Sequence, residues 1–284
     1  MIQRDAELDD ANVRLGFFDV YHRNSFKEPA RTTWIEGWKV EYMAIARPES
    51  FHRTPIVIIG GAFQNFNSYK YCVEQLLDAG PIVLIDLPSM GANQQIRNID
   101  TGLSAGTLEL GDLAKMLGVW LDIEGLDKVS VMGMSLGSVV ASCLADQRPE
   151  LIDRMILMGV MQKTRKSWRM LLEESLHLMR EQRMDEFGQA VILYLVNHAK
   201  MDKTKMSPTA KRLFFRQMAA LAQRPSQVHM LHSLMQSHGQ LKRVISRQEQ
   251  SHLQTLLQQS AWGLLMEFRC LISVTRKMFV QRLI

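Results

Sequence analysis

Gly133-Met134-Ser135-Leu136-Gly137 is the stretch of this 284-residue chain from which the fold is best predicted. The run before it, residues 128–132, alternates apolar and polar side chains, as a short strand does. The run after it, residues 138–145, is small and apolar, which favours a buried helix. The sequence therefore predicts a strand, a sharp turn at Ser135 and a helix, in that order.

A serine between two glycines at such a turn is typical of a nucleophile elbow. The turn strains the backbone at the serine and brings strand and helix close together. Gly133 and Gly137 fit such a turn, because a Cβ on either flank would clash. The hydroxyl of Ser135 then projects above the sheet. The amide of Leu136, at the helix N-terminus, can point at a developing oxyanion. The pattern also fits a strand–helix turn that binds nothing, and this alternative stays open.

A second glycine-rich stretch, residues 60–62, follows the β-branched run of residues 56–59. That run is typical of a central strand buried on both faces. Two glycines after it let the backbone turn tightly and leave amides free, and the amide of Ala62 is the candidate second oxyanion donor. An ordinary strand–loop glycine pair is the alternative for these residues alone. Beside the elbow we favour the oxyanion role.

Further strands and helices alternate along the first half of the chain. Helical spacing joins Leu110, Leu113, Leu117, Trp120 and Leu121. We expect Asp86 to order the loop that follows it rather than to act in catalysis. The other expected elements are a strand pair, or one strand with a tight turn, over 32–47, helices over 69–79 and 107–121, and strands over 82–85 and 155–159. The fold class predicted is α/β, a doubly wound and mostly parallel sheet with the nucleophile strand near its centre.

The character of the chain changes after residue 160. Stripes of apolar side chains at helical spacing, rich in methionine, continue to about residue 235. They predict a helical cap inserted over an active site. We therefore divide the chain into an α/β core over residues 1–160, a helical cap over 161–238 and an atypical basic segment over 239–284.

Composition limits the class of protein. No apolar run approaches the length of a membrane span, and the N-terminus lacks the apolar core of a signal peptide. Cys72, Cys143 and Cys270 are far apart and lack metal-ligand spacing, so reduced thiols, no metal site and a cytoplasmic location are expected. Nothing in the sequence requires a cofactor.

The net charge of +5 is concentrated at one end of the chain. Residues 241–284 carry seven Lys or Arg against two acids, which supplies the whole excess. A basic tail could attract nucleic acid or an acidic partner. Because no nucleic-acid-binding motif accompanies the charge, we expect no nucleic-acid partner.

With these motifs the chain resembles the α/β-hydrolase fold family over residues 32–240. The shared motifs are GGAF at 60–63, DLPSMG at 86–91 and GMSLG at 133–137. Within the family it looks most like the enzymes that make the lipid precursor of rhamnolipids, which join two 3-hydroxyacyl chains taken from a thioester carrier. The resemblance implies that Ser135 is the nucleophile and that the amides of Ala62 and Leu136 form the oxyanion hole.

The resemblance also implies the substrate. It is a small-molecule acyl ester or thioester, with a 3-hydroxyacyl group on acyl carrier protein or coenzyme A as the specific expectation. Ser135 would attack the carbonyl, form an acyl-enzyme and pass the acyl group to water or to another hydroxyl. This chemistry needs a histidine base and an acid, in the chain order serine, acid, histidine.

The chain departs from the family pattern after residue 240. Glu267 is the only acid that follows a possible strand there, and no histidine follows it. We assign neither the acid nor the histidine of the triad. The basic, Asp-free composition of residues 258–284 suggests a shifted reading frame or an early end. A second interpretation therefore stays open: a catalytically incomplete member of the fold that binds an acyl ligand or a protein partner.

Overall fold

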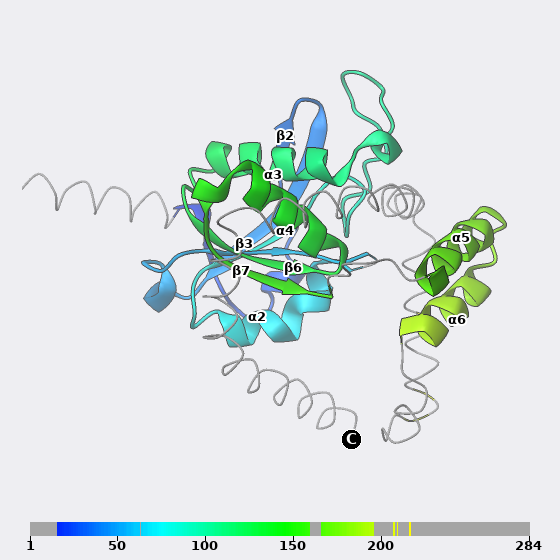
Figure 1. Ribbon diagram of the computed structural model, residues 1–284. Coiled ribbons are helices and arrows are strands. Elements are labelled where there is room, and N and C mark those ends of the chain that lie inside the picture. Colours follow the sequence, from blue (N-terminus) through cyan, green and yellow to red (C-terminus); the bar gives the residue numbers. More distant parts are fainter. Residues whose placement is uncertain are drawn as a thin grey trace, which may run out of the picture.

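The computed structural model describes residues 16–62, 64–159 and 166–195, together with Ser207, Thr209 and Arg216. Within this part of the chain a sheet carries helices on both faces (Figure 1). The helices predicted beyond residue 195 lie largely outside the described residues. The basic segment over 239–284, with Cys270 and Glu267, lies wholly outside them.

The sheet has seven strands, in the order β1-β3-β5-β4-β6-β7, with β2 paired to β3. Strands β5, β4, β6 and β7 are parallel, whereas β3 runs antiparallel to β5 and to β2. The strand bounds are β1 (Asp19–Val20), β2 (Arg31–Ile35), β3 (Trp38–Ala46), β4 (Ile56–Ile59), β5 (Ile82–Asp86), β6 (Val129–Met134) and β7 (Ile152–Met158). The predicted mostly parallel α/β sheet is confirmed. Strand β6, which leads to Ser135, is an interior strand between β4 and β7.

Five α-helices and five short 3₁₀ helices lie in the described residues. The α-helices are α2 (Lys70–Leu76), α3 (Leu110–Ile123), α4 (Leu136–Gln147), α5 (Lys166–Arg180) and α6 (Met184–Leu195). The 3₁₀ helices are η1 (Ser25–Lys27), η2 (Pro48–Ser50), η3 (Phe66–Tyr69), η4 (Ala105–Thr107) and η5 (Pro149–Leu151).

The alternating stretch over 32–47 forms a hairpin of β2 and β3. Its two turn residues, Glu36 and Gly37, have φ of 47° and 76°. Positive φ at both positions is the geometry of the tight two-residue turn that matches strand twist. Of the two alternatives that the sequence left open, the pair of antiparallel strands is confirmed.

The two faces of the sheet bury separate apolar clusters. Val57 and Ile59 of β4 belong to the cluster that contains α3 and α4, whereas Ile58 belongs to the cluster with α2. Side chains alternate across a strand, so an uninterrupted apolar run is required wherever helices cover both faces. Figure 1 shows α3 and α4 on one side of the sheet and α2 on the other.

Helix α3 begins at Leu110, after the predicted start at residue 107. The segment over 105–107 is instead a 3₁₀ turn. Glu109 and Asp112 form a reciprocal capping box at the start of the helix, with the Glu109 amide donating to Asp112 Oδ2 at 2.8 Å. The cap satisfies amides that the first turn leaves free, and it places the start of the helix at the first residue of the apolar stripe. All five residues of that stripe are buried, as predicted.

Helices α5 and α6 follow β7 and pack against each other. In Figure 1 they lie beyond the edge of the sheet toward which the arrows of β6 and β7 point. Leu172, Leu176 and Met179 of α5 lie three to four residues apart and are buried, as an apolar stripe at helical spacing predicts, and Phe187 of α6 is fully buried. The position suits a cap over the carboxyl ends of the parallel strands. The bounds of the cap at 161–238 stay a prediction.

Candidate active site

Ser135 occupies a strained turn between β6 and α4. Its φ of 50° and ψ of −109° lie outside the ordinary regions for a residue with a side chain. Its amide donates to the Met158 carbonyl of β7 at 2.7 Å, which ties the turn to the neighbouring strand. The residue is exposed, whereas Leu136 after it is 2% exposed. Backbone outliers of this kind cluster at functional sites, and the catalytic role of Ser135 stays a prediction.

The two elbow glycines are required by close approach of backbone, as predicted. A methyl group on Gly133 would lie 2.6 Å from the Ser138 Cα, so only glycine lets α4 begin this close to β6. A methyl group on Gly137 would overlap the Ile59 carbonyl oxygen and lie 2.6 Å from the Gly60 carbonyl oxygen. The second clash is therefore with the end of β4 rather than with β6. Gly137 lets the helix pass directly over the neighbouring strand.

The side chain of Ser138 links the elbow to β7 through hydrogen bonds. Its hydroxyl lies 2.7 Å from the Gly133 carbonyl oxygen and 2.9 Å from the Met158 carbonyl oxygen, and it accepts from the Met158 amide at 3.2 Å. The side chain is fully buried. A buried hydroxyl with its hydrogen bonds satisfied stiffens the local structure. Ser138 is thus a structural serine beside the exposed one.

Replacing Ser135 with glycine is expected to raise the free energy of unfolding by about 1 kcal/mol. A positive φ costs a residue with a Cβ about 1–3 kcal/mol. Glycine removes this cost, but it loses more conformational entropy on folding, which offsets part of the gain. Ser135→Ala is the matched control, because alanine keeps the Cβ and so keeps the strain. Urea denaturation of the three proteins measures the difference. Equal stability of the glycine and alanine variants would show that the turn is unstrained.

The turn after β4 lies against the same serine. A methyl group on Gly61 would lie 3.1 Å from the Ser135 Cβ, which places this backbone beside the nucleophile candidate. Ala62 is partly buried and packs against the cluster that contains α3 and α4. Among the described residues, no acceptor takes a hydrogen bond from the amide of Ala62 or of Leu136. Phe63, the last residue of the GGAF motif, lies outside the described residues. The oxyanion roles stay predictions.

A hydrogen-bonded group that the sequence analysis missed supports this turn. The Gly61 amide donates to Gln64 Oε1 at 2.7 Å, and the Tyr69 hydroxyl donates to the same oxygen at 2.6 Å. Burial raises the pKa of Tyr69 above its ordinary value, so its hydroxyl keeps its proton and remains a donor. A signal was present in the sequence: a glutamine three residues after a turn glycine can reach back to its amide.

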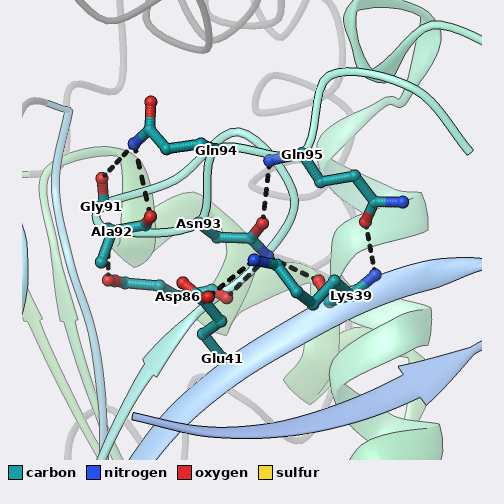
Figure 2. Close-up of polar contacts among 8 residues, drawn as sticks. All are labelled: Lys39, Glu41, Asp86, Gly91, Ala92, Asn93, Gln94 and Gln95. Atoms are coloured by element: carbon teal, nitrogen blue, oxygen red, sulfur yellow. Dashed lines mark hydrogen bonds and ion pairs between the residues drawn. The ribbon is translucent and has the colours of Figure 1, made fainter. Parts of the chain in front are cut away.

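Asp86 orders the loop after β5, as predicted. The carboxylate is 3% exposed and accepts from the Ala92 amide at 2.7 Å. Gly91, with φ of 53°, passes so close that any Cβ there would overlap the carboxylate. Asn93 donates to the Asp86 carbonyl oxygen at 3.2 Å (Figure 2). These contacts hold the loop that contains the DLPSMG motif in a fixed conformation, and Asn93 also ties it to the Lys39 carbonyl oxygen of β3.

Three histidines lie in the described residues, and none is hydrogen-bonded to Ser135. His22 pairs with Glu28 at 2.7 Å, and His177 pairs with Glu181 at 3.3 Å on α5. His52 is exposed after η2. The other histidines lie outside the described residues: His198, His229, His232, His238 and His252. The acid and the base of a triad therefore stay unassigned.

No three His, Cys, Asp or Glu side chains in the part of the chain that the structure describes are grouped so as to hold a metal ion. No helix among the described residues is both long and apolar enough to cross a membrane.

Cys72 and Cys143 are free thiols, and burial raises the pKa of Cys143 to about 11, so this thiol stays protonated at neutral pH.

Comparison with known proteins agrees with this architecture. Residues 54–227 match the family model described as alpha/beta hydrolase fold. No curated protein gives a significant match.

Solved structures share the fold at low identity. An alpha/beta hydrolase enzyme from a Medee basin deep-sea metagenome library has a TM-score of 0.61 at 15% identity, with 72% of each chain covered. The enol-lactonase from Burkholderia xenovorans has a TM-score of 0.58 at 12% identity, covering 72% of this chain and 73% of the other. A thermophilic esterase from Thermogutta terrifontis has a TM-score of 0.56 at 14% identity, with 72% of each chain covered.

Proposed function

The chain belongs to the α/β-hydrolase fold family, and we propose that it is a hydrolase or acyltransferase that works through an acyl-enzyme on Ser135. The observation that carries the proposal is the exposed serine at a strained turn between β6 and α4. A fold family alone does not fix an activity, so the site must carry the argument. A second glycine-rich turn beside the serine supports the same chemistry.

In the proposed reaction the Ser135 Oγ attacks the carbonyl carbon of an acyl ester or thioester. The hydroxyl proton passes to a base that we assign to no residue, and the developing oxyanion accepts hydrogen bonds from the amides of Ala62 and Leu136. The carbonyl–oxygen or carbonyl–sulfur bond then breaks, and the leaving group takes the proton. Water or a second hydroxyl then attacks the acyl-enzyme carbonyl, the bond from the acyl carbon to Ser135 Oγ breaks, and the proton of the attacking group passes through the base to Oγ.

The substrate proposed is an acyl chain on a small-molecule ester or thioester. The resemblance to the enzymes of rhamnolipid-precursor synthesis favours a 3-hydroxyacyl group carried on acyl carrier protein or coenzyme A. In that case the acceptor is the hydroxyl of a second 3-hydroxyacyl chain, and the product is an ester of two chains. The enol-lactonase and the esterase among the similar structures favour hydrolysis as the simpler outcome.

A second candidate is a catalytically incomplete fold member that binds an acyl ligand or a protein partner. It is favoured by the sequence after residue 240, where Glu267 is the only acid after a possible strand and no histidine follows it. The free thiols of Cys72 and Cys143 favour a reducing compartment such as the cytoplasm for either candidate.

The test is incubation of the purified full chain with acyl p-nitrophenyl esters and with 3-hydroxyacyl coenzyme A of several chain lengths. Mass spectrometry of the products separates the free acid made by hydrolysis from the two-chain ester made by transfer. We expect turnover of at least one acyl class, abolished in Ser135→Ala. Binding of the acyl compounds without turnover would overturn the enzyme proposal and favour the incomplete fold member.

A further inference from the structure

The turn after β4, which lies against Ser135, is held by a side-chain oxygen as well as by its own backbone. The side-chain oxygen Gln64 Oε1 accepts from the Gly61 backbone amide at 2.7 Å, and the Gln64 backbone amide donates to the Gly61 carbonyl oxygen at 3.2 Å. These two bonds close a small ring from Gly61 to Gln64. A ring of this kind fixes the backbone of the residues inside it, and Ala62 is one of them.

Tyr69 fixes the glutamine in turn. Its hydroxyl donates to the same oxygen at 2.6 Å, and the tyrosine is 5% exposed in the cluster that contains α2. A methyl group on Gly60 would lie 3.1 Å from this hydroxyl, so the tyrosine also contacts the start of the turn. Gln64 Oε1 therefore accepts from the Gly61 amide in the turn and from the buried Tyr69 hydroxyl of η3.

The ring also determines which amide is available to a substrate. The Gly61 amide is occupied by Gln64, while the Ala62 amide donates to no described acceptor. The Gly61 backbone approaches Ser135 closely enough that a methyl group there would lie 3.1 Å from the Ser135 Cβ. A displacement of this turn would change the distance between an oxyanion donor and the reacting carbonyl directly.

We infer that Gln64 and Tyr69 are positioning residues, which hold the turn over 60–62 so that the Ala62 amide faces the oxyanion formed at Ser135. The inference rests on the proposed function of Ser135. Gln64 acts through the Gly61 amide, and Tyr69 acts through Gln64. Neither side chain takes part in bond making or breaking. Their effect is on the transition state, because the oxyanion forms only there.

The first test compares Gln64→Met with the wild-type chain. Methionine keeps the length of the side chain and removes the acceptor. We expect kcat to fall by about 10- to 100-fold with little change in KM, since misplacement of a donor by about 1 Å has an effect of that order. Gln147→Met at the end of α4 is the matched control, because the Gln147 side chain is exposed and donates to the Gly111 carbonyl oxygen of α3 at 3.0 Å, so its loss should leave kcat unchanged. A wild-type kcat in Gln64→Met, or a loss that appears in KM instead, would overturn the inference.

A double-variant cycle tests the order of action. Tyr69→Phe removes one donor to Gln64 and should lower kcat less than Gln64→Met does. The variant with both changes should be no slower than Gln64→Met alone, because Tyr69 has nothing left to position. Independent, multiplying losses would show that Tyr69 does not act through Gln64.

Hydrogen exchange provides a readout that does not depend on catalysis. In Gln64→Met the peptide that spans β4 and η3 should take up deuterium faster at the Gly61 amide, while the peptide of β5 is unchanged. If the wild-type chain neither turns over acyl substrates nor reacts at Ser135, the proposed function fails, and this measurement still decides whether Gln64 holds the turn. Unchanged exchange in Gln64→Met would overturn the positioning role whatever the activity.

Discussion

Replacing Ser135 with alanine is expected to lower kcat for acyl substrates by about 10⁴-fold or more, with the fold unchanged. Loss of the nucleophile in serine hydrolases leaves only the rate that oxyanion donors and binding supply. Alanine keeps the Cβ and adopts the same strained turn, so the free energy of unfolding should stay close to that of the wild-type chain. Steady-state kinetics and urea denaturation of the same preparation measure the two quantities.

Ser130→Ala is the control for this experiment. Ser130 lies on β6, five residues before Ser135, and is only partly exposed. Its removal should leave kcat close to the wild-type value. Retention of activity in Ser135→Ala would mean that another group carries the chemistry. An equal loss in both variants would mean that the assay reports damage to the strand.

Gly137→Ala is expected to have the largest effect on stability. The added methyl group would overlap the Ile59 carbonyl oxygen, and that atom is backbone in a central strand and cannot rotate away. Overpacking of a core typically costs about 1–3 kcal/mol and more where backbone must move, so we expect a loss of about 3 kcal/mol or more. The displaced β4 would carry the turn over 60–62 with it, so activity should fall as well.

The matched control is Gly118→Ala in the interior of α3. A methyl group there would lie 3.6 Å from Arg148 Cγ and Leu144 Cδ1, which is ordinary van der Waals contact. Because alanine is the better helix former, this change should raise the free energy of unfolding by about 0.5–1 kcal/mol. Urea denaturation of both variants gives the comparison. Similar stabilities for the two alanine variants would contradict the close approach of α4 to β4.

The sequence predicts local structure well wherever one periodic pattern decides it. The β-branched run over 56–59 predicts strand β4 with its observed bounds, because such a run is typical of a strand buried on both faces of a sheet. The alternation around Gly37 predicts either a strand pair or one strand with a tight turn, and the structure decides for the pair. The start of α3 is less predictable, since it depends on the capping box of Glu109 and Asp112.

The site is only partly readable from the sequence. The motif at 133–137 predicts the elbow and a clash for any Cβ at Gly133 or Gly137. The partner of Gly137, the Ile59 carbonyl oxygen, lies 78 residues earlier in the chain and is brought in only by the pairing of β4 with β6. The role of Asp86 as a loop-ordering acid follows from its turn-rich context. The hydrogen bonds of Gln64 to Gly61 and Tyr69 were missed, because glutamine fits many loop roles and no motif distinguishes this one.

The central claim is that Ser135 is an activated nucleophile, and reaction with a fluorophosphonate probe tests it most directly. The probe bonds covalently only to a serine whose hydroxyl is deprotonated by a working base, and intact-mass spectrometry counts the labels on each chain. We predict one label per wild-type chain and none on Ser135→Ala. Absence of label on the folded wild-type protein, or an equal mass increase in the alanine variant, would contradict the account.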